Sequence, residues 1–123
     1  MDRRYIFILI ILSGMTIGFK NLYATSEFIP GIDGLPLMEG LVLIPEQQVF
    51  FETSNGRIVE VLASSENSPR DIMLYYTETL KQLGWIPTLQ NEFRREEEKL
   101  SIQIYDHKTE KFVVRFSISP ISD

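Results

Sequence analysis

The sequence predicts an α+β fold: an antiparallel sheet of about five strands with a single helix packed on one face, as a two-layer sandwich. Three observations predict it. Two β-prone segments, 48–52 and 57–63, flank a turn and indicate a hairpin. One amphipathic segment, 69–83, has the start and stop signals of a helix. Two segments with alternating side chains, 100–105 and 112–119, then follow as strands.

The length and charge of the chain indicate one acidic domain. Its 123 residues carry 12 Lys and Arg against 17 Asp and Glu, a net charge of −5. Such a length is usual for a single domain. Because negative charge repels phosphate backbones and anionic lipid surfaces, we expect no nucleic-acid partner.

The first 24 residues have the pattern of a signal peptide. Arg3 and Arg4 precede an apolar run over 5–19, and Ala24 offers a small side chain before a cut. The run is shorter than the ~20 apolar residues that span a bilayer, which disfavours the alternative of an uncleaved anchor. We therefore expect a periplasmic or secreted protein, anchored in the inner membrane only if the segment is retained. The chain has no cysteine, so neither lipidation nor a disulfide framework is expected.

Residues 25–47, called the lead-in below, precede a domain expected over 48–123. Proline and glycine are frequent here, which disfavours a regular helix or a central strand. The lead-in also carries many apolar side chains, too many for a solvated linker. We expect an extended, turn-rich segment whose apolar side chains are covered.

The hairpin is expected to turn at Asn55 and Gly56, because Asn-Gly supplies the positive φ values of a type I′ turn. This register would pair Phe50 with Val61 and would place apolar pairs on both faces. Both faces are then expected to be packed.

Capping residues define the helix. Ser68 can accept a hydrogen bond from a free amide, and Pro69 suits the first helical position. Gly84 suits a left-handed stop, after which Trp85 would fold back on Leu80 as part of the core. Short strands are expected over 85–89 and 92–96, and a loop over 106–111 joins the two alternating strands.

The chemically active side chains do not converge. His107 is the single histidine and sits in a loop, and the glutamates 96–98 would point to alternate faces of a strand. Ser64 and Ser65 have no base nearby in sequence, as a nucleophile would need. We therefore predict no catalytic, cofactor or metal site.

The segment 35–41 is the best candidate for binding a partner, since it combines apolar side chains with fixed turns. An alternative is that it simply covers the first hairpin. The outward tyrosine of the helix is a further contact candidate. The predicted partner-binding residues are Leu35, Pro36, Leu37, Met38, Leu41 and Tyr75.

Four stretches, LPLMEGL, GRIVE, YYTETLKQLGW and FSISP, resemble a group of small exported proteins of alphaproteobacteria that has no assigned activity. The similarity spans most of the chain after the signal segment. It implies an exported location and the same fold, and it transfers no catalytic residue.

These features favour a non-catalytic exported domain that binds another envelope protein through its lead-in or an exposed sheet edge. The alternative is a module that binds a small ligand or a lipid in a pocket between helix and sheet. A closed core around Trp85, Phe93, Phe112 and Phe116 would argue against that pocket. An enzyme is disfavoured because polar residues do not converge.

We expect the exported chain to begin at Thr25, because signal peptidases accept a small residue before the cut. Mass spectrometry of the chain recovered from the envelope fraction tests this. A chain that begins at Met1 would contradict cleavage, and recovery from the cytoplasm alone would contradict export.

Overall fold

The computed structural model describes residues 27–107 and 111–121, so the predicted signal peptide, 1–24, lies outside the described residues. The same holds for positions 108–110 of the predicted loop. The elements along the chain are β1 (Leu41–Leu43), the 3-10 helix η1 (Pro45–Gln47), β2 (Val49–Thr53), β3 (Gly56–Ser65), α2 (Pro69–Gln82), β4 (Ile86–Pro87), β5 (Glu92–Arg95), β6 (Glu98–Asp106) and β7 (Phe112–Pro120).

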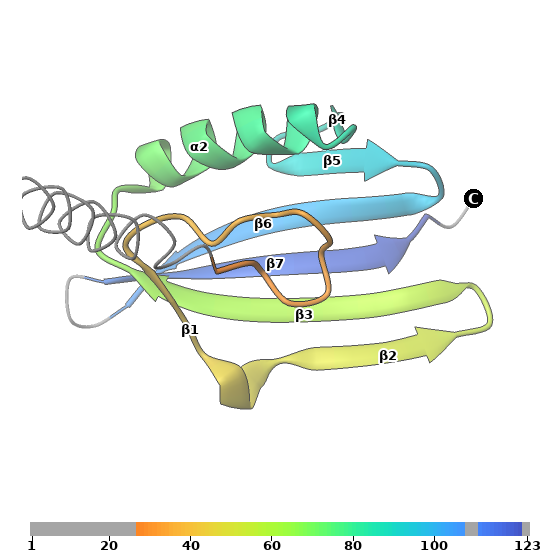
Figure 1. Cartoon of the computed structure of the whole chain (residues 1–123), viewed down its shortest axis with the longest axis horizontal. Helices are drawn as coiled ribbons and strands as arrows, with labels where there is room; N and C mark the ends of the chain where they lie inside the picture. The colour runs from red at the N-terminus through yellow and green to blue at the C-terminus, as the bar shows by residue number, and fades with distance from the viewer. Residues whose placement is uncertain (1–26, 108–110, 122–123) are drawn as a thin grey trace, which may run out of the picture.

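The strands form one antiparallel sheet in the order β1-β3-β7-β6-β5-β4 (Figure 1). Both β1 and β2 pair with β3, β1 along 63–65 and β2 along 56–60. The α+β class with an antiparallel sheet is therefore confirmed, but the expectation of about five strands is wrong, since residues 27–107 and 111–121 contain one α-helix and a sheet of seven strands. An edge strand needs only one neighbour, so three residues between Gly40 and Pro45 suffice to form β1 within the lead-in.

The predicted register of the first hairpin is also wrong. Thr53 pairs with Gly56, and Phe50 pairs with Val59 rather than Val61. The turn forms one residue earlier because the Thr53 hydroxyl donates to the Gly56 carbonyl at 2.8 Å and accepts from the Asn55 N–H at 3.2 Å. Pairing shifts by two residues, so each side chain keeps its predicted face.

The helix α2 has the ends that its sequence predicts. Ser68 Oγ accepts a hydrogen bond from the Asp71 N–H at 3.1 Å. At the other end, Gly84 has φ +90°, and the Trp85 N–H donates to the Leu80 carbonyl at 2.9 Å. This Schellman arrangement ends the helix and turns Trp85 into the core, where it is 1 % exposed.

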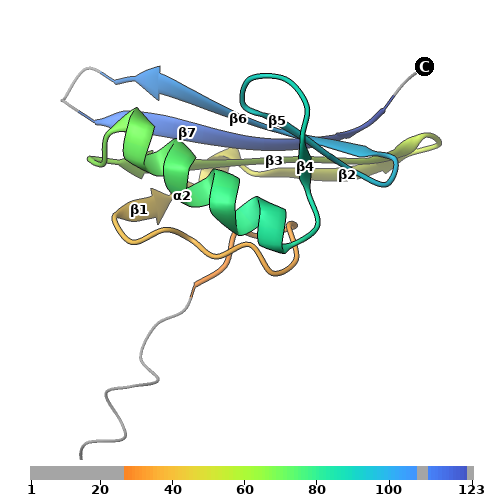
Figure 2. The same cartoon turned by 90° about the horizontal axis from the view of Figure 1, so that it is seen from above.

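The core lies between one face of the sheet and the segments that cover it. Figure 2 shows α2 and the lead-in on the same side of the sheet. No described element covers the opposite face, which we call the open face. Both covering segments supply buried apolar side chains, namely Ile29, Ile32, Leu35 and Leu41 from the lead-in and Ile72, Tyr76 and Leu80 from α2.

Replacing Trp85 by alanine is expected to lower the free energy of unfolding by about 3 to 5 kcal/mol, as for other large buried aromatics. The Arg95 guanidinium lies over the Trp85 ring, with its central carbon 4.5 Å from the ring centroid. Chemical denaturation measures the loss. Leu74→Ala is the control, because Leu74 is exposed on the helix and should change stability little. A Trp85→Ala variant as stable as this control would contradict the assignment of Trp85 to the core.

Candidate functional site

The structure divides the predicted partner-binding residues into two groups. Leu35 and Leu41 are buried in the core, where a partner cannot reach them. The other four are half-buried on the surface: Pro36, Leu37, Met38 and Tyr75. Both belong to the same buried cluster as Val59 and Val61 of the first hairpin, as the alternative that this segment covers the hairpin would require.

Tyr76 fixes the middle of this segment. Its hydroxyl donates to the Pro36 carbonyl at 3.0 Å and accepts from the Met38 N–H at 2.8 Å. The ring is fully buried and meets Phe116 edge to face, with centroids 4.9 Å apart. Burial raises the pKa of Tyr76, and the hydrogen bond from Met38 opposes part of this rise. Tyr76 thus links the lead-in to the sheet through α2, while Tyr75 lies at the rim.

The surface beside this segment is hollowed but open. Met38, Glu39, Gly40, Asn67 and Tyr75 line a hollow of about 560 Å³. Its wall is held by the Asn67 side-chain amide, which donates to the Glu39 carbonyl at 2.8 Å. An open hollow of this kind does not enclose a small molecule as a ligand pocket does.

Three of the four aromatic side chains expected in a closed core between helix and sheet are buried there, namely Trp85, Phe93 and Phe116. Phe112 is half-buried at the end of β7 and lies outside that buried cluster.

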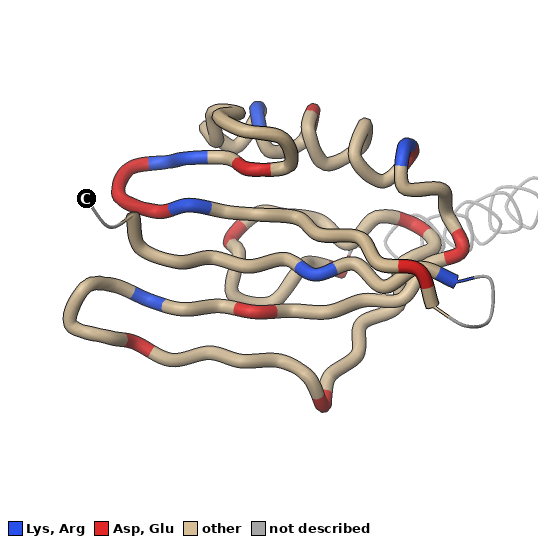
Figure 3. The backbone as a smooth tube through the Cα atoms, turned by 180° about the vertical axis from the view of Figure 1, so that it is seen from behind, with Lys and Arg blue, Asp and Glu red and all other residues tan. Residues whose placement is uncertain are grey.

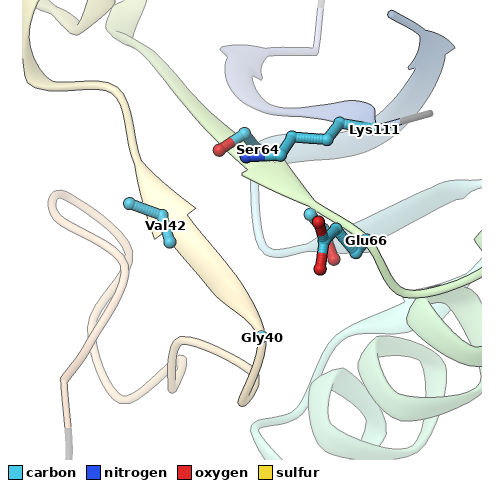
Figure 4. Close-up of a pocket in the computed structure, with 6 residues that line it drawn as sticks. Gly40, Val42, Ser64, Glu66 and Lys111 are labelled. Carbon is cyan, nitrogen blue, oxygen red and sulfur yellow. The ribbon is translucent and has the colours of Figure 1, made fainter. Parts of the chain in front are cut away.

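A smaller hollow of about 150 Å³ brings together polar residues that are distant in sequence (Figure 4). The Lys111 side chain extends toward Ser64, with Glu66 nearby. Sequence reasoning missed this proximity because it depends on the pairing of β3 with β7. A serine beside a lysine can form a nucleophile and base, but the lysine must be desolvated to lose its proton near neutral pH. Lys111 is exposed, and the two residues lie in a polar part of the surface.

Within residues 27–107 and 111–121, no three His, Cys, Asp or Glu side chains gather as metal ligands. His107 lies exposed at the end of β6, and its backbone N–H donates to the Lys111 carbonyl at 2.8 Å. None of the helices in 27–107 and 111–121 is long and apolar enough to cross a membrane.

The edge strand β2 carries three consecutive exposed apolar side chains. Val49, Phe50 and Phe51 are 40 %, 48 % and 54 % exposed, and all five residues of β2 lie at the surface. Antiparallel pairing with β3 leaves the N–H and C=O groups of alternate β2 residues pointing away from the sheet. Sequence reasoning identified this strand but expected both of its faces to be packed.

The other edges carry features that discourage pairing with another chain. β4 has two residues and contains Pro87, and β1 has three residues and is soon followed by Pro45. Short strands and prolines are common protections of sheet edges. β2 has neither proline nor lysine and is therefore the unprotected edge.

The apolar surface of β2 ends where the open face becomes polar. On that face Phe51 is opposite Ile58, while Val49 is opposite Glu60. Arg115 of β7 forms an ion pair with Glu60 at 3.6 Å. It also donates to the Gln103 side chain at 3.3 Å. This confines the exposed apolar side chains next to β2 to a narrow stripe along the edge.

Comparison with known proteins gives no match, whether to a family model, a curated protein or a solved structure. Function is therefore argued from the described surface. Its most distinctive feature is the unprotected apolar edge formed by β2.

Replacing Tyr76 by phenylalanine is expected to lower the free energy of unfolding by about 1 to 3 kcal/mol. The change leaves the Pro36 carbonyl and the Met38 N–H without their partner. Hydrogen exchange of the Met38 amide should accelerate, and Tyr75→Phe serves as the control. Unchanged exchange at Met38 would contradict the role given to this hydroxyl.

The same variant should also alter the alkaline stability of the protein. Because burial raises the pKa of Tyr76, the folded state holds this proton above pH 10, where an unfolded tyrosine loses it. The unfolded state then binds fewer protons, so stability is intact below pH 10 and falls as the pH rises further. Denaturation between pH 9 and 11, roughly spanning the tyrosine pKa, should show a smaller fall in Tyr76→Phe than in Tyr75→Phe.

Proposed function

We propose that the chain is a non-catalytic exported domain that binds another envelope protein by accepting a strand of that protein along β2. The observation that carries this proposal is the unprotected apolar edge of β2. The basic and apolar residues of 1–24 support the exported location. In this proposal α2 and the sheet form a two-layer scaffold that holds β2 in place.

Strand addition uses the two kinds of group that β2 exposes. Backbone groups that point away from the sheet supply hydrogen bonds to the added strand, which give affinity. Side chains on alternate faces supply selectivity: Val49 and Phe51 on the open face, and Phe50 on the covered face. Aromatic side chains are common anchors of protein interfaces.

The lead-in acts mainly as part of the scaffold in this proposal. Leu35 and Leu41 are buried, and Tyr76 holds the chain between Pro36 and Met38. The sheet edge is therefore favoured over the lead-in as the principal contact. The buried cluster around Trp85 likewise favours binding at the surface over binding a small ligand or lipid in a pocket.

A benzophenone side chain at position 51 should cross-link the partner in living cells, because Phe51 is exposed on the edge strand beside the position of the added strand. The same group at position 89 is the control, since Leu89 is also exposed but lies outside every strand. Mass spectrometry of the adducts identifies the cross-linked protein. Adducts with an envelope protein at position 51 and not at 89 are expected. No adduct at 51, or equal adducts at both positions, would contradict the proposal.

A further inference from the structure

The edge strand β2 lies in a part of the chain whose charged residues are all acidic. Over residues 27–56 there is no lysine, arginine or histidine. Figure 3 shows red and no blue along η1 and β2. Five acidic residues fall in the same stretch: Glu27, Asp33, Glu39, Glu46 and Glu52.

The cation nearest to this stretch in sequence is already bound by carboxylate. Arg57 lies opposite Glu52 in the hairpin and contacts Glu98 through Nε at 2.7 Å and Nη2 at 3.2 Å. Its Nη1 donates to the Gly31 carbonyl at 2.6 Å. The Glu98 hydrogen bond is the main cause that raises the pKa of Arg57, and the charges of Asp33 and Glu52 add to it.

The Arg57 guanidinium forms its ion pair with Glu98. Glu52 lies opposite Arg57 in the register of the hairpin, and no described lysine or arginine forms an ion pair with Glu52. On the open face, Arg115 is similarly held by Glu60. A partner that brings positive charge to Glu52 would complete this arrangement.

The alternation of β2 determines where that charge must lie. Phe50 and Glu52 share the covered face, whereas Val49 and Phe51 share the open face. Side chains of an added strand would lie directly opposite these, about 4.5 to 5.5 Å away at Cβ. Apolar side chains suit the positions opposite Val49, Phe50 and Phe51, and a cation suits the position opposite Glu52.

We propose that the strand accepted by β2 is an extended segment of another protein that combines apolar residues with a lysine or arginine placed against Glu52. This inference rests on the proposed function and names the chemistry of its partner. A second copy of this chain fits poorly, because its β2 carries Glu52 and no cation. The net charge of −5 on each copy would oppose their approach.

Three capped heptapeptides test the inference on the full chain as it is recovered from cells. In the first, one lysine precedes and one follows a run of three valines, so that either strand direction can place valines opposite Val49, Phe50 and Phe51 and a lysine opposite Glu52. In the other two, glutamine or glutamate replaces both lysines. Backbone amide shifts in NMR spectra locate binding and give its affinity. The lysine peptide should shift the β2 amides and bind on the order of tenfold more tightly than the glutamine peptide at low salt. This advantage should fall as salt screens the charges.

Two variants show whether Glu52 is responsible. Glu52→Gln should remove several-fold of the advantage of the lysine peptide, and Glu52→Lys should favour the glutamate peptide. Glu78→Gln is the control, since Glu78 is an exposed acidic residue on α2. It should leave the preference unchanged.

The outcomes separate this inference from the proposed function. If all three peptides shift the β2 amides with equal affinity, strand addition stands and the cationic partner is overturned. A lysine preference that Glu52→Gln leaves unchanged also overturns it. If no peptide shifts the β2 amides, or if sedimentation shows a dimer and the β2 amides shift as that dimer forms, both proposals are overturned.

Discussion

In the described part of the chain, one short α-helix and the lead-in together cover one face of a wide sheet (Figure 2). The helix α2 has 14 residues, which gives a length of about 21 Å and a width of roughly 10 Å. The path of six strands from β1 to β4 is wider, because neighbouring strands lie about 4.8 Å apart. The lead-in covers part of what remains, and Tyr76 joins the two covering segments through its contacts with Pro36 and Met38. The unusual apolar content of the lead-in follows from this requirement.

The features that sequence reasoning predicted well are those that depend on neighbouring residues. Ser68 and Gly84 define the ends of α2 through contacts within a few residues, and Trp85 follows from the same local geometry. Pairing across the sheet was harder to predict. The Thr53 hydroxyl forms two hydrogen bonds in the first turn, which lies one residue earlier than the sequence predicted. The contact between Arg57 and Glu98 depends on strands that are distant in the chain.

The same difference between local contacts and pairing of distant strands applies to the candidate site. Apolar side chains at Val49, Phe50 and Phe51 are visible in the sequence, but their exposure depends on which strand lies at the edge. The lead-in presents the opposite case, since Leu35 and Leu41 resemble surface anchors in sequence and are buried in the fold. An apolar segment therefore indicates a contact, whereas the order of the strands decides whether that contact is internal. The polar hollow at Ser64 and Lys111 likewise requires β3 and β7 to be neighbours.

The strand order also constrains when the chain can fold. β7 is the last of the described strands in sequence, yet it lies between β3 and β6 near the middle of the sheet. Its pairing with β3 joins distant positions, as between Val61 and Phe116, and such long-range closure slows folding. A chain that emerges from its amino-terminal end presents the lead-in, β2 and β3 before β7 exists to pair with them. Apolar segments that are synthesised first thus need protection until the carboxyl-terminal strand arrives, and loss of that strand would leave both β3 and β6 without a central neighbour.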